Sequence, residues 1–252
     1  MSGHSKWANI KHQKGAADQK RGKIFSRISK EIIVSVKTGG ADPDTNARLR
    51  AAVLAARSAN MPVANVERAI KKGSGEGTDT ASYEEIVYEG YGTDGVAILV
   101  ECLSDNRNRT GGEIRLIFDR NGGNMAGSGA VTWMFPRKSH FIVAGENATE
   151  DKLLDLILEA GAEDLIIENG TAEIWGPVDA FDSISKALEK ANIPAEEAGL
   201  TRKPENYVQI TDKDKASRLI RLVEKFEDQD DVQAVHANFD IPEEILNSIQ
   251  ID

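Results

Sequence analysis

The sequence predicts a multidomain protein of class α and α+β: an N-terminal three-helix domain, then an α+β domain with a ferredoxin-like βαββαβ domain inserted in it. Three observations support this prediction. Apolar residues recur at helical spacing as far as Lys72, the stretch GSGEGTDT at residues 73–80 is typical of a flexible linker, and beyond it strand-like and helix-like segments alternate. The expected domains are residues 1–80, residues 81–135 together with 205–252, and the insert 136–204.

Glycine, proline and capping residues predict where the helices of the N-terminal domain begin and end. The first helix is expected to end at Thr38-Gly39-Gly40, because glycine favours the helix C-terminus. Asp42-Pro43 predicts the start of a second helix, with Asp42 as N-cap and Pro43 in the first turn. This helix should stop at Met61-Pro62, and a third should cover residues 63–72 and end at Gly73.

Beyond the linker, the spacing of apolar residues shifts towards the period of two that strands show. Residues 85–89, 96–103 and 130–135 are expected strands. Thr110 and Glu113 match a capping box for a helix that ends at Asn121-Gly122-Gly123.

The insert and the chain after it continue this alternation. The order β-α-β-β-α-β, which is that of ferredoxin-like domains, is predicted for residues 141–144, 150–160, 164–168, 171–175, 181–191 and 197–200. A strand, a helix, a strand and a last helical turn are expected at residues 207–210, 213–227, 232–238 and from Pro242.

The charge is divided unevenly along the chain. The net charge is −10, yet residues 1–72 carry 15 Lys and Arg against 5 Asp and Glu, and residues 73–252 carry 16 against 36. A basic portion can lie on phosphates while an acidic portion is repelled by them. The chain should therefore bind a polyanion in one orientation.

Residues 3–37 concentrate the positive charge. At about 100° per residue, Lys23, Arg27, Lys30 and Lys37 fall on one side of a helix, opposite an apolar side made of Ile24, Phe25, Ile28, Ile32 and Val36. An ordinary amphipathic helix with a basic outer face would show the same pattern. The preceding segment favours a partner, because it is basic, polar and too poor in apolar residues to need a core.

These patterns define a set of candidate contacts to nucleic acid. The expected phosphate-facing residues are Lys6, Lys11, Lys14, Lys20, Arg21, Lys23, Arg27 and Lys30. His12, like His4, is expected to contact phosphate or base, and Trp7 either stacks on a base or anchors the arm to the helical domain. Arg107 and Arg109 lie just ahead of the helix start predicted at Thr110, which suits a bound phosphate, although a polar loop with solvated arginines would look the same.

The sequence predicts no catalytic residue, no metal site and no cofactor. The four histidines stand singly, no Cys or His pair has zinc spacing, and the glycines at residues 73–77 lack the Gly-Lys-Ser/Thr of a nucleotide loop. Cys102 is expected to be a buried thiol in a reducing cytosol. No stretch reaches the roughly 20 apolar residues of a membrane span. We expect a cytoplasmic protein with no membrane partner and no small-molecule substrate.

Three blocks of sequence resemble the YebC/PmpR proteins, a family that includes mitochondrial translational activators of cytochrome oxidase subunit I. The blocks are GHSKWANIKHQKGAADQKRGKIFSR from Gly3, NARLRAAVLAARSANMP from Asn46 with ERAIKKG from Glu67, and YEGYG from Tyr88 with VECLSDNRNRT from Val100. The resemblance covers essentially the whole chain. It departs at Gly111-Gly112, where relatives carry better helix formers.

The resemblance implies three domains, with the ferredoxin-like one inserted, and a cytoplasmic, non-enzymatic factor of gene expression. Some members are described as DNA-binding transcriptional regulators and others as ribosome-associated factors that help translation through difficult sequences. The leading hypothesis is a DNA-binding, probable transcriptional regulator that acts through the basic arm and helix, and the alternative is a ribosome-associated factor contacting rRNA or tRNA. An adaptor whose arm binds an acidic protein and a nuclease are the hypotheses from other classes.

Overall fold

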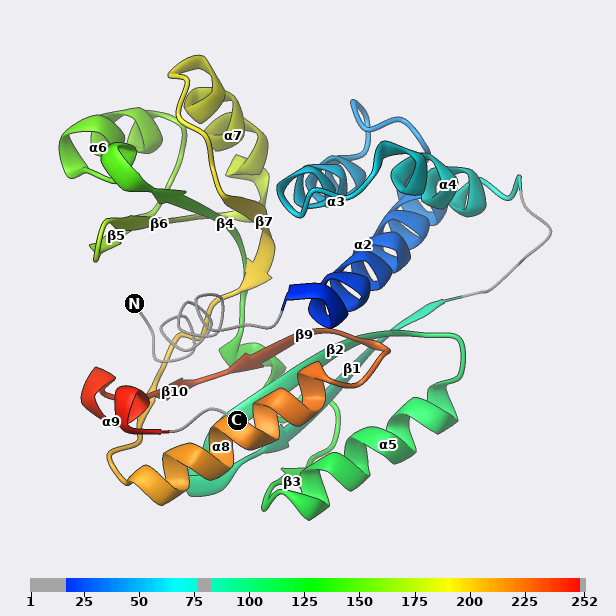
Figure 1. Cartoon of the computed structure of the whole chain (residues 1–252), viewed down its shortest axis with the longest axis vertical. Coiled ribbons are helices and arrows are strands. Elements are labelled where there is room, and N and C mark those ends of the chain that lie inside the picture. Colours follow the sequence, from blue (N-terminus) through cyan, green and yellow to red (C-terminus); the bar gives the residue numbers. More distant parts are fainter. Residues whose placement is uncertain (1–16, 77–82, 250–252) are drawn as a thin grey trace. The chain divides into compact units, whose positions relative to one another are not determined.

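The computed structural model describes residues 17–76 and 83–249, which form two compact units (Figure 1). Residues 24–76 and 137–202 make up unit 1. Residues 83–136 and 203–249 make up unit 2, and residues 17–23 group with it. The N-terminal helices and the insert thus share one unit, while the segments on either side of the insert come together in the other.

Three helices follow one another in the N-terminal part: α2 (Ala17–Gly39), α3 (Ala47–Ser58) and α4 (Val63–Gly73). The expected ends of the first and third helices are confirmed. The predicted start of the second helix at Asp42-Pro43 is wrong, because Asn46 is the N-cap. The Asn46 side chain accepts a hydrogen bond from Leu49 N at 3.1 Å and donates two, to Ser35 O and Gly40 O, whereas the Asp42 carboxylate closes a tight turn onto Asp44 N.

Along α2 the burial changes from one end to the other. Ile32 and Val36 of the expected apolar side are buried, and so are the three residues between Ile32 and Val36, whereas Ile24 is 40% exposed. Residues 32–36 of the helix are therefore buried all round, whereas Lys37 and the two residues after it are exposed. The amphipathic pattern deduced from the sequence does not continue through residues 32–36.

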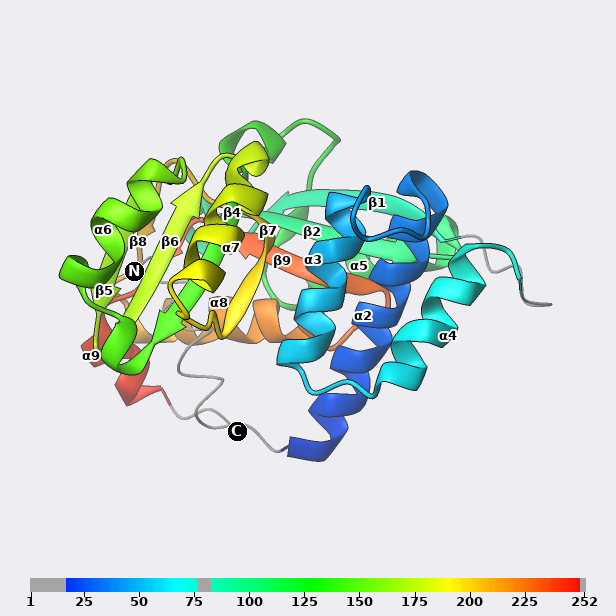
Figure 2. The same cartoon turned by 90° about the horizontal axis from the view of Figure 1, so that it is seen from above.

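The insert has the ferredoxin-like order that the sequence predicts. Its elements are β4 (Arg137–Ala144), α6 (Glu150–Glu159), β5 (Asp164–Glu168), β6 (Thr171–Gly176), α7 (Phe181–Lys190) and β7 (Glu197–Arg202). The strands form an antiparallel sheet in the order β5-β6-β4-β7, and α6 and α7 cover one face of it (Figure 2). Alternate residues of β4, Phe141 and Val143, enter the core with Leu153, Ile174 and Ile184.

Within unit 1, α3 packs against β7 and closes the side of the insert's core. Ala51 belongs to that core, and Leu54 packs against it from the same helix. Arg50 forms two hydrogen bonds with the carboxylate of Asp182 on α7, one of them from Nε to Oδ1 at 2.9 Å. A helix of the N-terminal segment is thus part of the apolar and polar packing of the inserted domain.

Unit 2 is built around a second four-stranded antiparallel sheet. Its main elements are β1 (Glu84–Tyr91), β2 (Ala97–Ser104), α5 (Arg107–Arg120), β3 (Asn124–Met125), α8 (Lys213–Glu227) and β9 (Val232–Ala237). The sheet order is β3-β1-β2-β9, so a strand from beyond the insert completes it. Helices α5 and α8 pack together on one face, where the rings of Phe118 and Phe226 meet edge to face at 4.6 Å.

The end of unit 2 adds two short elements. Strands β8 (Val208–Gln209) and β10 (Phe239–Asp240) pair in parallel, and α9 (Glu243–Ser248) follows. The chain leaves unit 2 at Pro136 and re-enters at Lys203, where Lys203 N donates a hydrogen bond to Pro136 O at 3.1 Å. The two ends of the insertion are therefore adjacent in space.

The strand expected at residues 130–135 is wrong. This segment contains a 3-10 turn at Thr132–Met134, and Val131 and Phe135 cover the face of β2 opposite α5. Two of its backbone N–H groups, those of Val131 and Thr132, are taken by Glu89 of β1 instead of by a neighbouring strand. The Glu89 carboxylate accepts from Gly129, Val131 and Thr132 at 2.6–2.8 Å.

Candidate nucleic-acid interface

The structure describes half of the predicted contact residues. Lys6, Trp7, Lys11, His12 and Lys14 lie outside the described residues, and Lys20 lies in α2 without a described side chain. The predicted residues whose side chains can be placed are Arg21, Lys23, Arg27 and Lys30 on α2, and Arg107 and Arg109 on α5.

The first turns of α2 carry cations towards solvent. Arg21 and Lys23 are exposed, and Arg27 and Lys30 are half-buried. The Lys23 ammonium lies 2.9 Å from the backbone oxygen of Asp228 and 3.3 Å from its carboxylate. Because the two side chains are 44% and 65% exposed, this pair contributes only about 0–1 kcal/mol and a phosphate can displace it.

The start of α5 differs from the predicted capping box. Asn106 is the N-cap, accepting a hydrogen bond from Arg109 N at 3.1 Å, so Arg107 and Arg109 both lie in the first turn. Thr110 is buried inside the helix, where its hydroxyl bonds to Asp231 at 2.7 Å and to Ser104 at 2.6 Å. The box prediction is wrong because these buried partners engage the threonine.

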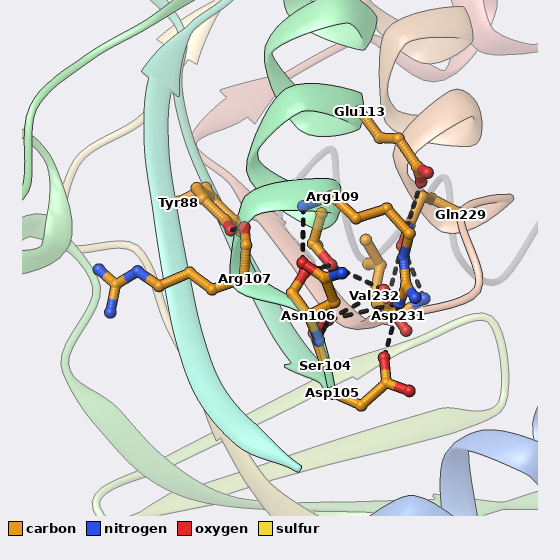
Figure 3. A network of polar contacts seen from close by, with 11 residues as sticks. Tyr88, Ser104, Asp105, Asn106, Arg107, Arg109, Glu113, Gln229, Asp231 and Val232 are labelled. Carbon is orange, nitrogen blue, oxygen red and sulfur yellow. Dashed lines mark hydrogen bonds and ion pairs between the residues drawn. The ribbon is translucent and has the colours of Figure 1, made fainter. Parts of the chain in front are cut away.

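Arg109 belongs to a network of polar contacts (Figure 3). Its guanidinium lies 2.6 Å from Asp231, which is only 5% exposed, and 2.9 Å from Asp105. The hydrogen bonds that Arg109 donates to these two carboxylates raise its pKa above the usual value. The charge of this arginine is thus neutralised within the protein.

Arg107 points the other way, past Tyr88 and away from Asp231 (Figure 3). It lines an open pocket of about 280 Å³ together with Tyr88, Asn108, Gly111, Gly112, Arg115 and Met125. The Tyr88 hydroxyl donates to the backbone oxygen of Arg107 at 3.2 Å, and burial raises the pKa of this phenol. A neutral tyrosine and two arginines therefore share one concave surface.

Sequence reasoning missed Arg115. Arg107, Gly111 and Arg115 are spaced i, i+4 and i+8, which places them along one side of a helix. This signal was hidden because the helix was predicted to start at Thr110, leaving Arg107 outside it. Because α5 starts at Arg107, Arg107 and Arg115 are the two arginines of this helix that line the pocket.

Within residues 17–76 and 83–249, no group of three or more His, Cys, Asp or Glu side chains is arranged to hold a metal ion. In the same residues, every helix is too short or too polar to cross a bilayer.

The chain was then compared with known proteins. A family model described as the TACO1/YebC protein N-terminal domain matches residues 5–76, and one described as the TACO1/YebC second and third domain matches residues 83–239. Relatives called "probable transcriptional regulatory protein" occur in Syntrophobacter fumaroxidans (49% identity over 99% of this chain and 100% of the relative) and Dictyoglomus turgidum (50%, with the same coverage).

A solved structure agrees with the fold. The crystal structure of a conserved hypothetical protein from Aquifex aeolicus is 45% identical and superposes with a TM-score of 0.86, over 95% of this chain and 98% of that one. Because both family models and full-length relatives match, the chain belongs to the TACO1/YebC family.

Proposed function

We propose that this chain is a non-enzymatic, nucleic-acid-binding regulator of gene expression that contacts phosphates through its basic N-terminal arm and α2. The observation that carries the proposal is the start of α2, where exposed Arg21 and Lys23 precede Arg27 and Lys30 in a chain whose remainder is acidic. The relatives named as probable transcriptional regulatory proteins support DNA as the leading target.

Contacts of this kind bind the phosphate backbone of the nucleic acid rather than its bases. Lysine and arginine side chains on phosphates release counterions, so the affinity depends steeply on salt and little on sequence. If six cations of the arm and α2 contact duplex DNA, the slope of log K against log salt concentration is about −5.

The test uses a matched pair of variants. We expect Arg21→Gln/Lys23→Gln to make the slope on duplex DNA shallower by about 2, as two phosphate contacts are lost. The control Lys186→Gln/Lys190→Gln removes the same charge from exposed positions on α7. Fluorescence anisotropy of a labelled duplex over a salt series measures both slopes. An unaltered slope in the α2 variant contradicts the proposal.

The second candidate is a ribosome-associated translation factor that contacts rRNA or tRNA. Backbone-directed cations favour it as well, since structured RNA offers the same phosphates. Sedimentation of cell extracts through a polysome gradient, with and without RNase, separates the two. Co-migration with ribosomes that Arg21→Gln/Lys23→Gln weakens supports translation, whereas footprints at particular promoters support transcription.

A further inference from the structure

We propose that the pocket on α5 binds one nucleotide unit of a single-stranded nucleic acid, with its phosphate at Arg107 and Arg115. The inference rests on the proposed function only in taking nucleic acid as the source of that phosphate. It assigns a second site, on unit 2, to residues that the basic surface of α2 does not include.

The pocket exists because α5 contains two consecutive glycines. Gly111 and Gly112 lie one turn after Arg107 and Asn108 and one turn before Arg115. A side-chain carbon added at Gly112 would meet no atom within 4 Å, and one added at Gly111 would come 3.3 Å from the Tyr88 hydroxyl. The missing side chains leave a notch in the helix surface between the two arginines.

Glycine inside a helix is unfavourable. Each one costs the helix about 1 kcal/mol relative to alanine, so the pair weakens α5 by about 2 kcal/mol. In return, the two glycines leave open space at the surface of α5 and let a ligand come close to the helix backbone. A ligand that binds between Arg107 and Arg115 requires this space and this access.

The lining suits a phosphate attached to a less polar body. Arg107 and Arg115 present planar guanidinium groups, which bind phosphate oxygens in a bidentate manner, and none of the lining residues carries a carboxylate. Asn108 adds an amide, while Tyr88 and Met125 form the apolar part of the wall. These apolar surfaces offer contact to a sugar or base.

The size of the pocket limits the ligand. Its volume of about 280 Å³ is slightly below the roughly 300–1,000 Å³ typical of small-molecule sites. Such a space accepts one nucleotide unit, and its open side lets the neighbouring units of a strand continue into solvent. Single strands can place one unit in a pocket because their backbone is free to turn a nucleotide outward.

The experiment titrates a 5′-phosphorylated trinucleotide into the full chain and follows the backbone amides of Gly111 and Gly112 by NMR. These amides report binding at the pocket itself, even while the arm binds elsewhere. We expect saturable shifts, and a dissociation constant that rises on the order of tenfold for each arginine removed in Arg107→Gln/Arg115→Gln. The control Arg218→Gln/Arg221→Gln makes the same charge change on exposed positions of α8 and should leave the constant unchanged.

A second variant tests the notch without touching either arginine. Gly112→Asp adds a carboxylate in the open space beside them and should abolish the shifts, while Gly112→Ala, which adds a single carbon to the notch, should weaken binding less. Uridine monophosphate is titrated in parallel. Equal binding of the free nucleotide shows that the site also takes unlinked phosphates, and weaker binding shows that the strand contributes.

Three results would overturn the inference: no shift at the two glycines, shifts that survive Arg107→Gln/Arg115→Gln, or equally tight binding of a triglutamate peptide. The titration is repeated in the Arg21→Gln/Lys23→Gln background. Shifts that persist there, together with a normal salt slope, would reject the role of α2 and retain the pocket. A shallower slope without shifts at the glycines would reject the pocket and retain the role of α2.

Discussion

At the scale of single residues, the buried carboxylate of Glu89 organises a long loop. It is 3% exposed and accepts hydrogen bonds from three backbone N–H groups between Gly129 and Thr132. Burial opposes its ionisation, but these hydrogen bonds outweigh burial, so the pKa of Glu89 lies below its ordinary value. The loop therefore depends on a negative charge.

We expect Glu89→Gln to loosen this loop at neutral pH. Hydrogen bonds to a charged acceptor contribute about 1.5–3 kcal/mol, so the loop amides should exchange with solvent on the order of 100-fold faster. A lowered folded pKa means that the contribution is complete above the unfolded value, near 4.3, and is lost as the pH falls through the folded value. Hydrogen exchange of residues 126–135 should thus differ between variant and parent at pH 7, and the difference should disappear once the pH lies below the folded pKa.

The control for this measurement is Glu84→Gln. Glu84 is an exposed carboxylate on the same strand, so its removal should leave exchange of the loop unchanged at every pH of the series. A difference between Glu89→Gln and the parent that persists after Glu89 has become protonated would show that the charge is not what holds the loop.

Residues also show where sequence reasoning failed. Val131 and Phe135, four residues apart with alternating neighbours, imitate a strand, yet the partner that takes the backbone N–H groups of this loop lies about 40 residues earlier in the chain. Arg107 and Arg109 are separated by one position and were predicted to act together. Arg109 donates a hydrogen bond to Asp231, more than 120 residues away, whereas Arg107 lines the pocket. Neither partner can be deduced from local patterns.

At the scale of elements, the bounds of a helix are predicted correctly where a local cap and the spacing of its apolar residues determine them. The helix α8 was predicted with its observed bounds, because Asp212 caps it and its apolar residues recur at helical spacing. The start of α3 was misplaced because Asp42-Pro43 carries the stronger local signal. The deciding contacts of Asn46 reach back to Ser35 and Gly40, which local patterns do not reveal.

The N-cap of α3 at Asn46 can be tested against the cap at Asp42 that the sequence predicts. We expect Asn46→Ala to lower the free energy of unfolding by about 2–3 kcal/mol, because a helix cap is lost and two carbonyl groups lose their donor. Asp42→Ala, at the cap position suggested by the sequence, should cost about 0.5 kcal/mol, since Asp42 is exposed. Urea denaturation followed by circular dichroism compares the two. A larger effect of Asp42→Ala would place the cap where the sequence put it.

At the scale of the whole molecule, the insertion separates unit 2 into two segments that meet again at β9. The fold class was predictable because each domain keeps its own periodicity and because the βαββαβ order is unbroken between Pro136 and Pro204. The grouping of the N-terminal helices with the insert was not predictable. It depends on Ala51, Leu54 and Arg50 of α3, whose partners lie more than 80 residues further along the chain.

We expect unit 2 to fold without the insert. Lys203 N donates to Pro136 O, and Glu205 N donates to Met134 O at 3.0 Å, so a short Gly-rich turn can replace residues 137–202. A chain of residues 83–249 with this replacement should unfold cooperatively and give a dispersed NMR spectrum. The matched truncation to residues 83–136 should stay unfolded, because it lacks β9 and the six buried residues of α8. A disordered first chain or a folded second one would contradict this expectation.

The position of β9 has a consequence during biosynthesis. Strand β2 pairs with β9 across Val100 and Val235, so one edge of the sheet has no neighbour until the ribosome has added residues 232–237. Meanwhile the contiguous insert can already reach its native state. Nascent chains released before residue 232 would therefore present a bare, apolar β-edge, and cells that produce such fragments should find them prone to aggregation.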